Sequence, residues 1–210
     1  MKNLIIIGAR GFGREVYNLA VQTQAYSREW GVKGFLDDNP KALDKFNNYP
    51  PIISSVEDYE VQEDDLFICA LGDVFYKKKY VSMILLKRGI FTSIIHPTAI
   101  ISHNVKLGIG IIVGPFTYLG NDSSIGNFTT IQSHVAVGHD VTIKDYCQIN
   151  ALTFFGGFAE VGDETTVNPG AVITPKRKLG SNAVVGLNST VLRDVKSMST
   201  VFGTPAKELF

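Results

Sequence analysis

The stretch LGNDSS-IGNFTT-IQSHVA-VGHDVT-IKDYCQ, residues 119–148, carries an aliphatic residue at the first position of every hexapeptide. The same period continues without insertion or deletion from Ile95 to Val191, which makes seventeen repeats in register. A six-residue period fits neither an α-helix nor the two-residue alternation of an ordinary strand. It predicts a β-solenoid in which each hexapeptide forms one short strand and one corner, with the repeated residue pointing into the interior.

The period also predicts how the coils stack. If three hexapeptides form one triangular turn, residues eighteen apart in sequence lie on neighbouring rungs, roughly 4.7–4.9 Å apart. The seventeen repeats then form between five and six turns, and each turn buries its apolar residues against its neighbours. We expect this all-β domain to occupy residues 95–210, and we expect Val201–Lys207 to cover the open edge of the last coil.

Composition excludes several classes of function. The 210 residues contain 20 Lys plus Arg and 20 Asp plus Glu, so a generally basic surface for nucleic acid is not indicated. The longest apolar runs are far shorter than the roughly 20 residues that cross a bilayer, which argues against membrane insertion. The chain starts directly with a strand-like segment and no signal-peptide pattern, so we expect a cytoplasmic protein. Cys69 and Cys147 lie at apolar positions and are interpreted as buried thiols.

Residues 1–94 alternate between strand-like and helical patterns, which predicts a small parallel α/β domain of the Rossmann-like kind. A glycine turn, Gly8–Gly13, joins the first strand to the first helix. It is either a phosphate-binding turn or simply a tight connection. Asp37 and Asp38 follow the next strand, where they either face a ligand or form a solvated turn, and Gly72 follows the third strand.

Three further segments of this domain carry weaker signals. Ser54 or Ser55 is predicted to cap a short helix that runs through Tyr59. Val74–Arg88 is predicted to be helical, and its three lysines at 77–79 form either a solvated face or a pyrophosphate clamp. A last strand is expected over Phe91–Ile95.

Four segments extend this pattern to a known family: Ile5–Ala9, Gly34–Asp38, Ala70–Asp73 and Ile95–Ala99. Together with the hexapeptides they resemble the nucleotide-sugar and sialic-acid acetyltransferases of bacterial surface-glycan synthesis. The resemblance implies that the solenoid is a left-handed parallel β-helix and that the first domain holds the nucleotide of a sugar substrate. The residues that inherit this role are Gly11, Phe12, Gly13, Asp37, Asp38 and Gly72. Arg10 and Phe12 depart from the family, which commonly has a small residue and a histidine there.

His139 is the main candidate for chemistry in the solenoid. It follows the inward residue Val137 by two places, so it should lie on the outer surface near a corner, with Gly157 one rung above it and Asn121 one rung below. Imidazole can accept a proton from an amine or hydroxyl at neutral pH, and Asp140 could orient the ring. From spacing alone, His139 is either a catalytic base or a corner residue satisfied by water. The resemblance implies that His139 is the general base and Asp140 its acidic partner.

The resemblance also implies an acyl donor and an assembly. Acetyl-CoA would lie between adjacent solenoids of a homotrimer, and Gly157 N–H would bind the thioester carbonyl. Gln132 and Gln148 stand where the family commonly has Asn and a second His. Lys176 and Lys178 belong to a basic cluster that forms either a clamp for CoA phosphates or a charged corner, and Gly186 is assigned to the same donor site.

The resulting hypothesis is an enzyme that transfers acetyl from acetyl-CoA to the amino group of a nucleotide-linked 4-amino-deoxy sugar, without a metal. One alternative is O-acetylation of a sugar hydroxyl, for example on sialic acid. A second is a metal-dependent solenoid enzyme, although His103 and His139 would lie roughly 9.5 Å apart, too far to share one zinc unless His134 of a neighbouring chain approached. A third is a non-catalytic scaffold that binds nucleotide sugars.

Overall fold

The computed structural model describes residues 1–209, and its internal contacts divide the chain into two compact units. The first is Met1–Pro97 and the second is Thr98–Phe210. This division falls three residues after the boundary expected from the repeat. Neither helix in the described part of the chain is long and apolar enough to cross a membrane.

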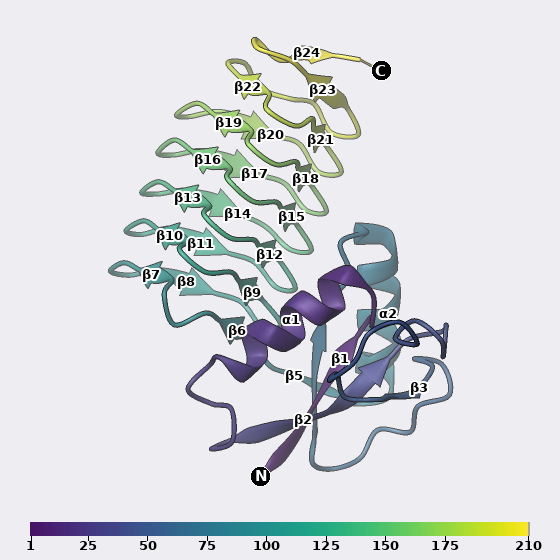
Figure 1. The fold of residues 1–210 in the computed structure, drawn as a ribbon. Coiled ribbons are helices and arrows are strands. Elements are labelled where there is room, and N and C mark those ends of the chain that lie inside the picture. The colour runs from purple at the N-terminus through teal and green to yellow at the C-terminus, as the bar shows by residue number, and fades with distance from the viewer. Residues whose placement is uncertain (210) are drawn as a thin grey trace. The chain divides into compact units, whose positions relative to one another are not determined.

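The first unit is a parallel α/β domain, as the alternating pattern predicts (Figure 1). Its five-stranded sheet has the order β3-β2-β1-β4-β5, and every neighbouring pair is parallel. The strands are β1 (Lys2–Ile7), β2 (Trp30–Leu36), β3 (Ile52–Ser54), β4 (Asp65–Cys69) and β5 (Ile90–Phe91). The helices are α1 (Gly11–Val21) and α2 (Val74–Leu86), and a last short strand is β6 (Ile94–Ile95).

The core of this unit follows from its apolar strands. Leu4–Ile7 of β1 and Phe67–Ile68 of β4 are buried, as expected for central strands covered on both faces. Helix α1 buries Val16 and Ala20, two of the residues that its helical spacing predicts to face inward. The strand order reverses at β1, so the carboxyl ends of β1, β2 and β4 meet where open parallel sheets bind ligands.

A polar cluster at the amino end of β4 links β2, β4 and the loop between β3 and β4. Lys33 Nζ donates to Tyr59 Oη at 2.7 Å and to Asp65 Oδ1 at 3.1 Å, and Tyr59 Oη donates to Asp65 Oδ2 at 2.7 Å. Burial would raise the pKa of Asp65. Hydrogen bonds from Tyr59, Gln62 N–H and Lys33 outweigh it and lower that pKa below its ordinary value. The cluster therefore stabilises the ionised carboxylate.

Two predictions for this unit are wrong. The short helix after Ser55 is only a turn, in which Asp58 N–H donates to Ser55 Oγ at 3.0 Å; Ile52–Ser54 instead form the edge strand β3. The last strand is interrupted, since β5 and β6 replace one continuous Phe91–Ile95 strand. In both places the apolar runs are only two or three residues long, so pairing partners rather than the local pattern determine the structure.

The second unit is a parallel β-helix with three sheets (Figure 1). Each strand from β7 to β22 contains two residues, the first pointing outward and the second inward. The first sheet contains β7 (Ile100–Ile101), β10 (Tyr118–Leu119), β13 (Ala136–Val137), β16 (Phe154–Phe155), β19 (Val172–Ile173) and β22 (Thr190–Val191). The second contains β8 (Lys106–Leu107), β11 (Ser124–Ile125), β14 (Thr142–Ile143), β17 (Glu160–Val161) and β20 (Lys178–Leu179). The third contains β9 (Ile112–Val113), β12 (Thr130–Ile131), β15 (Gln148–Ile149), β18 (Thr166–Val167), β21 (Val184–Val185), β23 (Thr200–Phe202) and β24 (Lys207–Glu208).

The eighteen-residue stacking predicted from the period is confirmed by the pairing register. Leu119 pairs with Val137, and Val137 in turn pairs with Phe155. The repeated residues from Val113 to Val191 are buried, whereas Ile101 in the first coil is 37% exposed. Cys147 is buried inside the solenoid and Cys69 inside the first unit, and neither forms a disulfide. Burial raises the pKa of the Cys69 thiol to about 12.

Two features complete the coils. Nearly every corner contains a residue with positive φ at six-residue intervals, including Asp140 (φ 59°) and Phe158 (φ 62°). Asp tolerates this left-handed conformation better than most residues. At the C-terminal end, β24 pairs antiparallel with β23, so Val201–Lys207 belongs to a hairpin that covers the strand edge, as predicted.

Candidate active site

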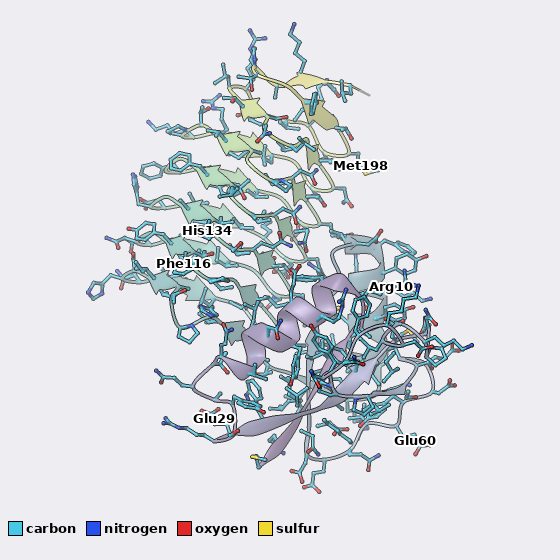
Figure 2. The ribbon with its side chains drawn as sticks, viewed as in Figure 1. Arg10, Glu29, Glu60, Phe116, His134 and Met198 are labelled. Carbon is cyan, nitrogen blue, oxygen red and sulfur yellow. The ribbon has the colours of Figure 1, made fainter. Side chains whose placement is uncertain are left out.

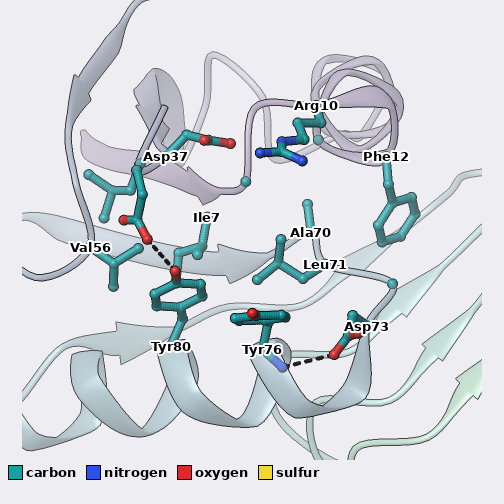
Figure 3. Close-up of a pocket in the computed structure, with 15 residues that line it drawn as sticks. Ile7, Arg10, Phe12, Asp37, Val56, Ala70, Leu71, Asp73, Tyr76 and Tyr80 are labelled. Atoms are coloured by element: carbon teal, nitrogen blue, oxygen red, sulfur yellow. Dashed lines mark hydrogen bonds between the residues drawn. The ribbon is translucent and has the colours of Figure 1, made fainter. Parts of the chain in front are cut away.

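A cavity of about 530 Å³ lies at the carboxyl ends of β1, β2 and β4 in the first unit (Figure 3). Five of the six residues assigned to nucleotide binding line it: Phe12, Gly13, Asp37, Asp38 and Gly72. The sixth, Gly11, begins α1 but is not part of the lining. Arg10, Asp73, Tyr76 and Tyr80 also contribute to the wall. The predicted residues are thus brought together at one edge of the sheet.

The glycine turn gives this cavity an anion-binding wall. A Cβ on Gly13 would lie 1.9 Å from Gly8 O, so only glycine permits α1 to pack this closely against the end of β1. Arg10 precedes α1 without a side-chain cap, which leaves the first-turn N–H groups available at the positive end of the helix. The Arg10 side chain points into the same cavity (Figure 3). This arrangement suits a phosphate group.

The two acidic residues have different environments. Asp37 accepts backbone N–H groups on both oxygens, from Ala9 at 2.9 Å and from Asn39 at 2.9 Å, so it mainly holds the loop in place. Asp38 accepts a hydrogen bond from the Tyr80 hydroxyl. That hydrogen bond, together with burial, raises the pKa of Tyr80 to about 12, so the phenol remains a donor at neutral pH. Asp38 is therefore the carboxylate that retains more of its acceptor capacity for a ligand.

Tyr76 and Tyr80 are the site residues that sequence reasoning missed. Both project from α2 toward the loop that carries Arg10 (Figure 3). Their rings are stacked at a centroid distance of 6.2 Å and an interplanar angle of 23°. Asp73 caps the helix by accepting Tyr76 N–H at 3.0 Å, which places Tyr76 in the first turn beside the cavity. The sequence signal that could have found them is a pair of tyrosines four residues apart, which lie on one helix face just after the end of a strand.

The lysine run does not line this cavity. Lys77 is fully buried within the protein, so the prediction of a solvated face is wrong for this residue, whereas Lys78 and Lys79 are exposed. Among the described residues that form the cavity wall, none is a lysine.

In the second unit, His139 and Asp140 occupy the corner between β13 and β14, as their spacing predicts. The His139 side chain is 60% exposed, and its Nδ1 lies 2.7 Å from Asp140 Oδ2. Because a carboxylate can only accept, this contact assigns the Nδ1 proton to His139 and leaves the Nε2 lone pair available. Phe158 packs edge-on against the imidazole, with ring centroids 5.1 Å apart and an interplanar angle of 89°.

Gly157 lies directly above the imidazole. A Cβ built on Gly157 would be only 2.6 Å from His139 Nε2, so any side chain here would occupy the space in front of the basic nitrogen. Within residues 1–209, the Gly157 N–H donates to no acceptor. The corner therefore presents a proton acceptor and a backbone hydrogen-bond donor next to each other.

The residues assigned to the acyl donor are spread over the solenoid. Gln148 is buried on the third sheet, where its Nε2 donates to Asn150 Oδ1 at 3.0 Å; Gln132 Oε1 accepts Ala151 N–H at 3.2 Å. These glutamines belong to the third sheet and the corner that follows it, whereas His139 lies at the corner after the first sheet. A single chain thus does not bring the glutamines and His139 together.

The remaining donor-site residues are placed as follows. Lys176 is exposed at the corner one rung above Gly157 and donates its N–H to Gly157 O at 3.0 Å. Lys178 forms an exposed ion pair with Glu160 at 3.0 Å. A Cβ on Gly186 would meet Phe202 at 2.3 Å, so the packing of β23 accounts for this glycine. Among residues 1–209, no three His, Cys, Asp or Glu side chains are grouped to hold a metal ion.

Comparisons with known proteins agree with this two-part arrangement. Residues 3–84 match the model of the PglD N-terminal domain. Over 97% of its length the chain is 27% identical to GDP-perosamine N-acetyltransferase of Escherichia coli O157:H7, of which it covers 95%. The chain is thus similar to a GDP-perosamine N-acetyltransferase over nearly its whole length, and its first unit is similar to the PglD N-terminal domain.

Two solved structures share the fold of the complete chain. The acetyltransferase domain of PglB from Neisseria gonorrhoeae FA1090 matches with a TM-score of 0.90 at 23% identity, covering 100% of both chains. PerB from Caulobacter crescentus, in complex with CoA and GDP-perosamine, matches with a TM-score of 0.84 at 23% identity, covering 100% of this chain and 98% of that one. The solenoid accordingly has the left-handed β-helix fold that the sequence resemblance implied.

Proposed function

We propose that this protein transfers the acetyl group of acetyl-CoA to the amino group of a nucleotide-linked amino-deoxy sugar. One observation carries the assignment of the reacting residues: His139 Nε2 faces the space kept open by Gly157, while Asp140 holds the opposite ring nitrogen at 2.7 Å. A carboxylate-oriented imidazole beside a backbone N–H is suited to acyl transfer by direct attack.

His139 acts as the general base in this reaction. Its Nε2 accepts a proton from the amine as the nitrogen attacks the thioester carbonyl carbon, and the ionised Asp140 stabilises the resulting imidazolium. The Gly157 N–H donates to the carbonyl oxygen, on which negative charge develops. A C–N bond forms, the C–S bond breaks, and the proton passes to the departing sulfur, so CoA leaves as a thiol. No acyl-enzyme intermediate is needed.

The cavity of the first unit is proposed to bind the nucleotide of the acceptor. The uncapped α1 N-terminus, which begins at Gly11, and Arg10 suit a diphosphate, and Gly13 and Gly72 line the cavity beside them. The E. coli relative is named as acting on GDP-perosamine, and the C. crescentus structure holds CoA together with GDP-perosamine. These relatives support a nucleotide-linked amino sugar as the acceptor class.

The first sheet of the solenoid is proposed to be the interface of a homotrimer. Its outward residues form an apolar column that includes Ile100 (61% exposed), Tyr118 (43%) and Phe154 (46%). At the adjoining corner, the Phe116 ring packs against His134 with ring centroids 5.1 Å apart and an interplanar angle of 39° (Figure 2). The second sheet instead presents Lys106, Ser124, Thr142, Glu160 and Lys178.

An exposed apolar column on only one flat face favours association through that face. Three copies would each place this face beside the His139 corner of a neighbour, and the acetyl-CoA groove would lie between them. Gln132, Lys176 and Lys178 would then contribute to the donor site from the walls of that groove, whereas Gln148 is buried on the third sheet. A cytoplasmic location is consistent with the supply of both proposed substrates.

The test is release of CoA thiol from acetyl-CoA with a panel of nucleotide-linked 4-amino sugars (GDP-, UDP- and dTDP-linked), their hydroxyl counterparts and free sialic acid. We expect turnover with at least one amino sugar and none with the matched hydroxyl sugar. Turnover with hydroxyl acceptors alone would replace N-acetylation by O-acetylation, and tight nucleotide-sugar binding without any thiol release would reduce the protein to a scaffold.

A further inference from the structure

The imidazole of His139 is held only weakly by its own corner. Its side chain is 60% exposed, and the side chain of Asp140, to which it is hydrogen-bonded, is 41% exposed. Water competes for both partners of an exposed contact of this kind, so the contact alone fixes a side chain poorly. A general base must keep its lone pair directed at the reacting atom, because a displacement of about 1 Å can cost about 10² in rate. The ring therefore needs a second support.

Phe158 supplies that support from the next rung. Val137 pairs with Phe155, so the corner that carries Phe158 is stacked on the corner that carries His139 and Asp140. The Phe158 N–H donates to His139 O at 3.1 Å, which fixes the spacing of the two corners. From this backbone position the Phe158 ring meets the imidazole at an interplanar angle of 89°, with ring centroids 5.1 Å apart, an arrangement that aromatic pairs favour. The stacking of the coils thus determines the contact.

The backbone gives no local reason for a phenylalanine at position 158. Phe158 has φ 62°, in the left-handed region that bulky residues disfavour. The equivalent corner positions of earlier coils are occupied by Asn104, Asp122 and Asp140, which are residue types that tolerate this conformation. Phe158 is also 49% exposed, so burial in the core does not account for the ring. Its contact with His139 does account for it.

We infer that Phe158 is a positioning residue for the catalytic base. Its ring restricts rotation of the His139 side chain, so Nδ1 stays on Asp140. Nε2 then stays directed at the space that Gly157 leaves open. The inference rests on the proposed acetyl transfer, in which His139 accepts the proton of the attacking amine. Phe158 acts through the imidazole and contacts neither substrate.

The first experiment measures thiol release by the full chain with the best amino-sugar acceptor. Phe158→Ala should lower kcat by about tenfold, which is less than the loss of about 10²–10⁴ for removal of a general base. The KM values for acetyl-CoA and acceptor should stay within about twofold of wild type, because no substrate contact is lost. Phe158→Tyr retains the ring and should keep at least about half of the wild-type kcat.

Tyr146→Ala is the matched control. Tyr146 is also a half-buried aromatic residue at a corner with positive φ, and its ring stacks on Phe128 with centroids 5.1 Å apart. The substitution removes a corner ring of the same kind away from His139, so kcat should remain that of wild type. An equal fall in kcat for Tyr146→Ala and Phe158→Ala would reduce Phe158 to a residue that merely stabilises the coil.

A double variant separates positioning from substrate contact. If Phe158 acts only through the imidazole, Phe158→Ala should leave the residual rate of His139→Ala unchanged, because the group that it positions is already absent. A further fall of about tenfold in the double variant would place Phe158 against a substrate and contradict the inference.

The orientation of the imidazole gives a readout that needs no turnover. Nitrogen-15 NMR of the four histidines distinguishes a proton on Nδ1 from a proton on Nε2, and His139→Ala identifies the signals of His139. Wild type should show the Nδ1–H tautomer that Asp140 accepts, and Tyr146→Ala should match it. Phe158→Ala should show a mixture of both tautomers. An unchanged tautomer in Phe158→Ala would overturn the inference, even with reduced kcat.

The two proposals fail in different ways. Absence of thiol release by wild type with every acceptor would overturn the proposed activity, and the tautomer of His139 would still decide whether Phe158 positions the ring. Thiol release by wild type that Phe158→Ala leaves unchanged would overturn the positioning role alone.

Discussion

The two units present their candidate sites in opposite ways. The first encloses a cavity of about 530 Å³ whose walls come from three strand ends and the starts of two helices of one chain. The second presents His139 on a corner where its side chain is 60% exposed, next to a glycine rather than inside a pocket. We infer that nucleotide binding is complete within one chain, whereas acetyl transfer requires a second copy to cover the His139 corner.

The largest effect is expected from removing the imidazole. His139→Ala should lower kcat by about 10²–10⁴, the range for loss of a general base, while nucleotide affinity stays unchanged because the cavity is in the other unit. Thiol release and calorimetry on the same preparation measure the two quantities. His103→Ala is the matched control, since His103 is also exposed and lies in the same corner column two rungs away. Retained turnover in His139→Ala would assign the base elsewhere.

A methyl group at Gly157 should have the next largest effect. Gly157→Ala would place a Cβ 2.6 Å from His139 Nε2, so either the imidazole or the acyl group must move. We expect kcat to fall by about 10², comparable with loss of one oxyanion donor. Gly31→Ala, whose Cβ would meet only the end of Met1 at 3.5 Å, should be indistinguishable from wild type. Normal kcat in Gly157→Ala would show that this space is not used in catalysis.

A charge on the apolar face tests the difference between the two units most directly. Tyr118→Asp should convert a trimer to monomers, because an exposed carboxylate in the apolar column would be desolvated at the interface. Light scattering should show a threefold lower mass, and acetyl transfer should fall at least about tenfold while nucleotide binding persists. Ser124→Asp makes the same change on the second sheet and should leave the mass unaltered. A monomeric wild type would contradict the shared-site interpretation.

The smallest effect on chemistry is expected at the polar cluster of the first unit. Asp65→Asn should lower the free energy of unfolding of this unit by about 2–3 kcal/mol at pH 7 without changing kcat, because it disrupts the buried contacts to Lys33 and Tyr59. Urea unfolding followed by the fluorescence of Trp30, the only tryptophan, reports on this unit.

The pH dependence of Asp65→Asn has a defined sign. The folded pKa of Asp65 is lowered, so its contribution is present above the ordinary carboxyl pKa of about 3.9 and is lost as pH falls through the lower folded value. The difference between wild type and Asp65→Asn should therefore shrink below about pH 4. Asp64→Asn, which removes an exposed ion pair with Lys2, should cost less than about 1 kcal/mol. An equal decrease in the free energy of unfolding for Asp65→Asn and Asp64→Asn would show that burial of the cluster adds no stability.

Periodicity predicted the solenoid well, because its structure is local and repeated. Each coil contacts only its neighbours, so the inward position of Val137 and the outward corner position of His139 follow from counting residues. In the first unit the same approach failed where pairing is non-local. The edge strand Ile52–Ser54 is too short to have a period, and it becomes a strand only because Phe35 and Leu36 of β2 lie beside it.

The sequence by itself determined the β-helix, the parallel α/β unit, the corner that carries His139 and Asp140, and the edge of the sheet at which the cavity of the first unit lies. These depend on the spacing of apolar residues and glycines along the chain. Only the tertiary structure decided that Tyr76 and Tyr80 face the cavity, that Asp37 is occupied by backbone while Asp38 is bound by Tyr80, and that Gly157 leaves the space in front of His139 Nε2. Such contacts join residues of different strands, helices and coils, and they depend on side-chain direction and crossing distance, which sequence spacing does not specify.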